Sequence, residues 1–166
     1  MSIVLDPNRD QLLSIELHYV EIKKKRGNTV FHVIHNAQEF EEWKAKGYTP
    51  IAELKQGQQA DKVIQKIQTS WRGIRWKEQN IIYSRSLRPS QKPDGTMFDT
   101  IDPLKYRDLK LKMCLKKWDA KDEKGNDIPV TDDIIDNLEP TVAHELLAAF
   151  EKVTEPNDDD LKDLER

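Results

Sequence analysis

Two stretches near the start of the chain have the hydrophobic pattern of β-strands. In IELHYVEI (residues 15–22), Ile15, Leu17 and Tyr19 alternate with polar residues on one face, and TVFHVIH (29–35) is rich in β-branched and aromatic residues. The intervening Gly27-Asn28 pair can supply the positive φ angles of a tight turn. These patterns predict a β-hairpin.

A helix is predicted directly after the hairpin. Asn36 is a suitable N-cap, and Glu39 three residues later completes a pattern typical of a capping box. Phe40 and Trp43 would share one face, and Gly47 would end the helix. Residues 51–54 are expected to form a further short strand, so residues 1–55 are predicted to be a ββα module.

Helical spacing of apolar residues is the dominant signal after residue 56. It predicts a helix over 60–68, with Val63, Ile64 and Ile67 as its apolar positions, and a second helix over 76–87 that begins at Trp76. The segment that follows, RPSQKPDGTMFDTIDP, contains three prolines and a glycine, and these predict a loop.

Capping signals mark three more helices in the second half. Asp102-Pro103 predicts the start of a helix that continues to Trp118, Thr131 the start of a short helix, and Pro140 the start of a last one. The predicted fold class is therefore α+β: an N-terminal β-hairpin plus helix (ββα) followed by a mainly α-helical bundle. The domains are expected at 1–55 and 56–154, with a flexible acidic tail over 155–166.

Composition narrows the class of protein. The chain has 166 residues, 34% of them charged, and one cysteine, Cys114, so a disulfide framework is excluded and a reducing compartment fits. The N-terminal MSIVLDPNRD reaches Asp6 too soon for a signal peptide, and no apolar run is long enough for a membrane span. We expect a soluble, cytoplasmic protein without a membrane partner.

No pattern of reactive residues indicates catalysis, a cofactor or a metal. Aligning Gly125 with the sixth position of a calcium loop puts Ala120 and Lys124 where ligands are needed. His32 and His35, three apart on a predicted strand, would point to opposite faces, and no cysteine cluster could complete a zinc site. Cys114 lies among apolar residues and is expected to be a buried, inert thiol. A non-catalytic protein without cofactors is predicted.

Charge is distributed unequally along the chain. Residues 55–92 contain nine Lys or Arg against two acidic residues, whereas residues 119–166 contain five against sixteen. The two parts could attract each other within one chain or between copies of a homo-oligomer, or both could be solvated faces screened by salt.

Basic residues next to tryptophan suggest a candidate interaction surface. In WRGIRWK, Trp71 could stack on bases while neighbouring cations contact phosphates, but Trp76 also leads the apolar face of the predicted helix, which favours a core role. A second basic run lies at the hairpin tip, where it could equally be a solvated turn. The candidate residues are Trp71, Arg72, Arg75, Lys77, Lys23, Lys24, Lys25 and Arg26. Binding of nucleic acid is disfavoured but stays open.

Several segments after residue 71 resemble a known class of proteins. These are IRWKEQN (74–80), DGTMFD (94–99), YRDLKLKMCLKKW (106–118) and the run from Asp122 to Phe150 that contains GNDIPVT and LEP. Together, over residues 71–153, they are most similar to the tail assembly chaperones of tailed bacteriophages. The resemblance implies a helical protein without enzyme activity or cofactor that binds tape-measure and tail-tube proteins in the host cytoplasm and self-associates.

The N-terminal ββα module departs from that helical pattern. Two alternatives therefore stay open beside the chaperone. One is a head–tail or tail structural protein found in the virion, and the other is an accessory protein that binds nucleic acid through its basic surface.

Overall fold

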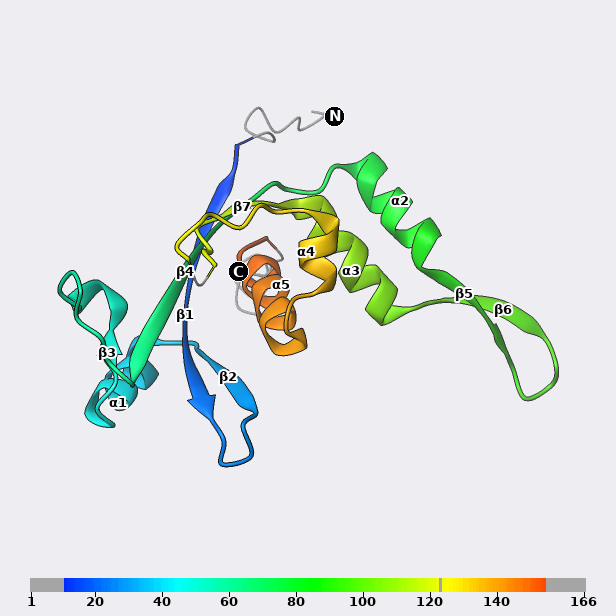
Figure 1. Cartoon of the computed structure of the whole chain (residues 1–166). Helices are drawn as coiled ribbons and strands as arrows, with labels where there is room; N and C mark the ends of the chain where they lie inside the picture. Colours follow the sequence, from blue (N-terminus) through cyan, green and yellow to red (C-terminus); the bar gives the residue numbers. More distant parts are fainter. Residues whose placement is uncertain (1–10, 123, 155–166) are drawn as a thin grey trace, which may run out of the picture.

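Two strands that are distant in the sequence organise the chain. In the computed structural model, which describes residues 11–122 and 124–154, β1 (Leu13–Lys23) runs antiparallel to β4 (Val63–Trp71). Their register places Leu13 opposite Trp71 and Val20 opposite Ile64. The pairing brings the N-terminal hairpin and the segment after residue 56 into one sheet (Figure 1).

The sheet has five strands. Its order is β2–β1–β4–β3, and β7 (Leu115–Trp118) also pairs with β4. β2 (Thr29–Ile34) completes the predicted hairpin with β1, and Gly27 in the turn has the expected positive φ of 81°. The two-residue β3 (Thr49–Pro50) lies parallel to β4 and leads into a short 3-10 helix, η1 (Ile51–Glu53).

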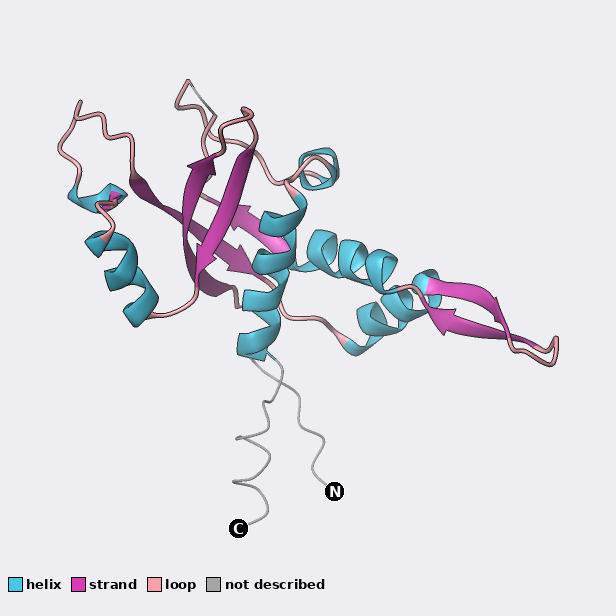
Figure 2. Cartoon of the chain, turned by 90° about the horizontal axis from the view of Figure 1, so that it is seen from below, coloured by secondary structure: helices cyan, strands magenta, loops and turns pink. Residues whose placement is uncertain are grey.

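The two faces of this sheet are covered by different helices. α5 (Pro140–Thr154) packs on the face that contains Ile15 and Trp71, and α1 (Ala37–Ala45) packs on the opposite face against Val20 and Ile64. Figures 1 and 2 show the two helices on either side of the strands. Because successive residues of a strand point to opposite faces, the odd-numbered apolar residues of β1 serve one core and the even-numbered serve the other.

An arm extends from the sheet on the side of β7. It consists of α2 (Trp76–Ser86), β5 (Leu87–Gln91), β6 (Met97–Ile101) and α3 (Pro103–Cys114). The two helices contact each other where Gln79 and Tyr83 of α2 lie beside Tyr106 of α3, and the β5–β6 ribbon projects beyond them (Figures 1 and 2). α4 (Asp132–Asp136) connects the end of β7 to α5.

The predicted helical bundle is wrong, and two segments account for the error. Of residues 60–68, expected as a helix, residues 63–68 belong to β4. A short apolar run such as Val63, Ile64 and Ile67 fits the helical and the strand period, and pairing with β1 decides between them. Residues 88–103, expected as a loop, form most of the β5–β6 ribbon instead. Residues 51–54, expected as a strand, contain η1 and its C-cap Leu54 instead. The helix expected to reach Trp118 ends at Cys114, where β7 follows.

The expected domain boundary at residues 55/56 falls inside a continuous sheet, since β1 and β4 lie on either side of it. The expected acidic tail, 155–166, lies outside the described residues. The helix starts were more predictable. Asn36 Oδ1 accepts a hydrogen bond from the Glu39 amide, Asp102 caps α3, and Thr131 Oγ1 accepts one from the Ile134 amide, so these N-caps are confirmed.

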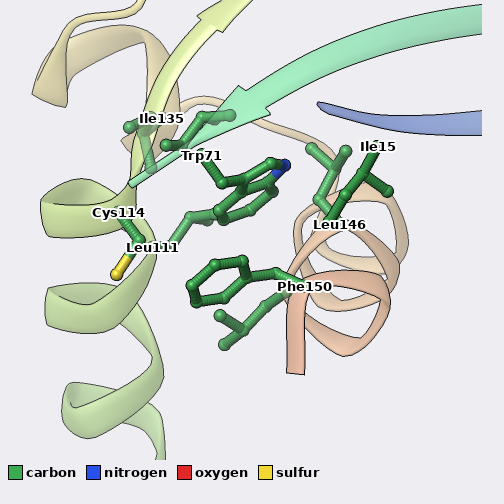
Figure 3. Packing of buried hydrophobic residues seen from close by; sticks show 9 residues of the cluster. Ile15, Trp71, Leu111, Cys114, Ile135, Leu146 and Phe150 are labelled. Carbon is green, nitrogen blue, oxygen red and sulfur yellow. The ribbon is translucent and has the colours of Figure 1, made fainter. Parts of the chain in front are cut away.

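Trp71 lies at the centre of the larger core. Its ring stacks on Phe150 of α5 with centroids 4.7 Å apart, as Figure 3 shows. Its indole Nε1 donates to the Thr69 hydroxyl at 2.7 Å, and that hydroxyl donates to the Ile15 carbonyl at 2.8 Å, so the buried polar atoms are all paired. Leu111 and Cys114 of α3 and Ile135 of α4 close the same cluster.

Trp71→Ala should lower the free energy of unfolding by about 3–5 kcal/mol, because it leaves a large cavity between β4 and α5. Urea denaturation followed by circular dichroism measures the change. Trp76→Ala is the matched control, since the same side chain is removed from an exposed position and the expected change is within about 0.5 kcal/mol. Equal effects of the two substitutions would contradict the assignment of Trp71 to the core.

Candidate functional site

The two tryptophans of WRGIRWK lie in opposite surroundings. Trp76, assigned by the helical pattern to a core face, is 80% exposed at the start of α2, and this assignment is wrong. Trp71, whose position was left open, is fully buried and presents no ring to solvent. Of the two rings, only that of Trp76 is accessible to a binding partner.

The cations beside Trp71 stabilise the start of α2. The Arg72 guanidinium pairs with Glu78 at 2.6 Å, and the Glu78 carboxylate also accepts from the Arg75 amide at 3.0 Å. The Arg72 amide donates to the Cys114 carbonyl at the end of α3, which ties the base of the arm together. Burial opposes the charged form of Glu78, but these hydrogen bonds and the two arginine charges outweigh it and lower its pKa.

The second basic run is remote from the first. Lys23 ends β1, and Lys24, Lys25 and Arg26 follow in an exposed turn at one end of the sheet. Lys77 and the start of α2 lie beyond its other end (Figure 1). The candidate cations therefore form two separate groups and no common surface.

Exposed apolar side chains concentrate on the arm. Of the eleven large apolar residues exposed in the described part of the chain, six lie between residues 76 and 104. They are Trp76, Tyr83, Leu87, Met97, Phe98 and Leu104. Trp76 and Tyr83, seven residues apart on α2, share one side of that helix, and Leu87 is the first residue of the ribbon that follows it. Patches of this kind mark interaction sites more often than singly scattered apolar residues do.

The ribbon is held at both ends by backbone hydrogen bonds. At the tip, the Lys92 amide donates to the Thr96 carbonyl at 2.9 Å, and Gly95 has a φ of 88° that suits glycine in this turn. The Thr96 amide donates to the Asp94 side chain, and this bond is the main cause of the lowered pKa of Asp94. At the base, the Asp102 amide donates to the Ser86 carbonyl at 2.8 Å.

Cross-strand register gives the ribbon two distinct faces. Leu87 lies opposite Ile101 and Gln91 opposite Met97, and these residues share one face with Pro89 and Asp99. Arg88, Ser90, Phe98 and Thr100 lie on the other face. We call the first set, residues 87, 89, 91, 97, 99 and 101, the Met97 face. No described residue outside β5 and β6 pairs with the ribbon.

Sequence reasoning did not select these arm residues, although a signal was present. TMFDTI alternates apolar and polar residues and follows the turn sequence KPDG, a combination that indicates a hairpin. Pro89 and Pro93 concealed it, because proline is a strong loop signal and is tolerated only on the edge of a sheet.

Cys114 and Asp122 are held by contacts within the protein. Cys114 is buried, as expected, and burial raises the pKa of its thiol to about 11, so the thiolate is scarce at neutral pH. Asp122 accepts hydrogen bonds from the side chain and the amide of Asn126, which lower its pKa and shape the loop that was compared with a calcium site. Within residues 11–122 and 124–154, no three His, Cys, Asp or Glu side chains are grouped so that they could hold a metal ion.

Among the helices of the described ranges, none combines the length and the apolar character needed to cross a membrane. Comparison of the chain with protein-family models finds no matching family, and comparisons with curated proteins and with solved structures find no similar protein. Only the chemistry of the arm itself therefore indicates what it could bind.

Glu78→Gln should weaken the base of the arm. We expect the free energy of unfolding to fall by about 1 kcal/mol at pH 7, because the substitution removes a charged hydrogen-bond acceptor. Since the pKa of Glu78 is lower in the folded than in the unfolded protein, its contribution is present above the unfolded pKa and is lost as the pH falls through the folded one.

The difference between Glu78→Gln and the wild type should therefore narrow on acidification. Urea denaturation at pH 7 and at pH 3 measures it, and Glu41→Gln at an exposed position of α1 is the control. A difference that is constant with pH would argue against a role for the Glu78 charge.

Proposed function

We propose that the protein is a non-catalytic binding protein that holds a partner protein through the arm, and that it does so during phage tail assembly. The concentration of exposed apolar side chains on the arm supports binding of a partner protein through the arm. Six such residues lie on α2, on the ribbon and at the start of α3, away from the part of α3 that packs into the core, and burial of this apolar surface against a partner is favourable.

The charge of the ribbon favours a protein over a nucleic acid as the partner. From Leu87 to Asp102 there are two cations, Arg88 and Lys92, against three carboxylates, Asp94, Asp99 and Asp102. Arg88 also lies 3.9 Å from Asp102, which partly neutralises it. Affinity for a phosphate backbone needs an excess of cations on the contacting surface, and the ribbon has none.

The phage setting rests on the resemblance of residues 71–153 to tail assembly chaperones. IRWKEQN contains the start of α2, DGTMFD contains the tip and the first residues of β6, and YRDLKLKMCLKKW contains most of α3, so the resemblance over residues 71–153 spans the arm. The helical fold that it implied is not the fold observed. The proposal keeps its functional part: binding of a tape-measure or tail-tube protein, in the host cytoplasm, before the tail is complete.

Leu87→Ser should weaken binding of the tape-measure or tail-tube protein encoded in the same gene cluster by at least about tenfold, since a single buried leucine is worth more than 1.4 kcal/mol at an interface. Co-expression and co-purification of wild-type protein identify the partner, and titration calorimetry measures the loss. Ile51→Ser is the matched control, because Ile51 is 42% exposed and Leu87 is 44% exposed. Ile51 directly follows β3, which lies on the side of the sheet away from the arm (Figure 1).

Absence of co-purification with either tail protein, together with intact tails after deletion of the gene, would overturn the phage part of the proposal. Binding that Leu87→Ser and Ile51→Ser weaken equally would overturn the role of the arm. Recovery of the protein from purified virions would replace an assembly factor by a structural component of the tail.

A further inference from the structure

The two outer edges of the ribbon differ in their capacity to accept another strand. The Lys92–Thr96 bond at the tip and the Asp102–Ser86 bond at the base fix which residues face inward, because hydrogen-bonded and non-hydrogen-bonded pairs alternate along an antiparallel pair. Even-numbered residues direct their amides and carbonyls to the partner strand. Odd-numbered residues direct theirs outward.

On β5 the outward position at the centre is occupied by Pro89, which has no amide hydrogen. A strand that pairs with this edge would lack one backbone hydrogen bond in the middle of the ladder. Proline at such a position protects a sheet edge against pairing with another strand. On β6 the outward positions are Met97, Asp99 and Ile101. Their backbone amides and carbonyls point away from β5 and are not used in the β5–β6 ladder. The outer edge of β6 is therefore the edge of the ribbon that can pair with another strand.

The side chains beside the open edge have a defined chemistry. Met97 and Ile101 flank Asp99 on the Met97 face, and Met97 is 61% exposed. An added strand would place its own side chains next to these three, so apolar residues would lie beside Met97 and Ile101 and the central one beside the Asp99 carboxylate. A lysine or arginine at that central position complements the charge.

A second copy of the chain fits this edge less well. Antiparallel pairing of β6 with β6 of another copy over the full strand brings Asp99 opposite Asp99, and like charges directly opposite each other are destabilising. A shift by two residues in either direction avoids this contact but leaves only three residues of each strand paired, Met97–Asp99 or Asp99–Ile101. The same carboxylate that favours a cationic partner strand therefore disfavours self-pairing.

We propose that the outer edge of β6 binds an extended segment of a partner protein as a third strand, with alternating apolar residues and a lysine or arginine placed beside Asp99. A two-stranded ribbon is marginally stable alone, and a third strand with an apolar face is the usual minimum for stability, so binding orders and stabilises the ribbon. This inference rests on the proposed function, since it assigns the binding mode of the arm.

Two proline substitutions at directly opposed positions test the edge. Met97→Pro removes an outward donor from β6, and Gln91→Pro removes one from the edge of β5 that Pro89 already interrupts. With the tail protein that co-purifies, Met97→Pro should lose at least about tenfold in affinity, corresponding to 1.4 kcal/mol, whereas Gln91→Pro should stay within about twofold. Equal affinities of the two variants, with Leu87→Ser still impaired, would overturn strand addition and leave binding by the arm intact.

A peptide experiment tests the charge without any natural partner. The probes are the acetylated peptide Thr-Val-Thr-Lys-Thr-Val-Thr and its counterpart with Glu for Lys, added to the full-length ¹⁵N-labelled protein. The Lys peptide should change the chemical shifts of the Met97 and Asp99 amides and protect them from hydrogen exchange. In the Asp99→Lys variant, the Glu peptide should produce this response instead of the Lys peptide. No response at β6, or an equal response to both peptides, would overturn the inference.

Discussion

The pairing of β1 with β4 is the constraint on which the other contacts depend. It joins segments about fifty residues apart and fixes which side chains of each face which layer. A slip of one residue would turn Trp71 away from Phe150 and expose it on the opposite face of the sheet. The same register sets Ile64 beside Val20 in the smaller core under α1. One ladder of backbone hydrogen bonds thus determines both cores, although the loop that it closes makes it costly in conformational entropy.

The arm inherits its position from that core. Immediately after Trp71, the Arg72 amide bonds to the last carbonyl of α3 and the Arg72 side chain bonds to Glu78 of α2, so both helices of the arm are attached at one point. Leu111 and Cys114 continue α3 into the cluster around Trp71. The exposed apolar surface of the arm is therefore held in place by two short helices whose bases are part of the packed interior. A loop would not fix its position in this way. Its apolar residues are exposed because the ribbon extends beyond the reach of the sheet and of α5 (Figure 2).

Local signals in the sequence predicted what local chemistry decides. The caps at Asn36, Asp102 and Thr131 and the turn at Gly27 depend on interactions within a few residues, and all were found. The errors arose where distant pairing decides: β4 carries an apolar pattern that suits a helix until β1 is beside it, and β7 continues a helix pattern past Cys114. The position of Trp71 was left open for the same reason, because its burial depends on Phe150, almost eighty residues later. Exposure of Trp76 likewise follows from how α2 packs on α3, which its own period could not disclose.

The ribbon is closed at its base by Ser86–Asp102 and at its tip by Lys92–Thr96, and this has a consequence for how related chains could vary in length. Because side chains alternate between faces, adding one residue to each strand would move the tip residues to the other face relative to the helices. Adding two to each strand would preserve both the faces and the inward and outward backbone groups. Evolution could therefore lengthen or shorten this part only in steps of four residues, about 7 Å of reach at a time, without altering the packed interior.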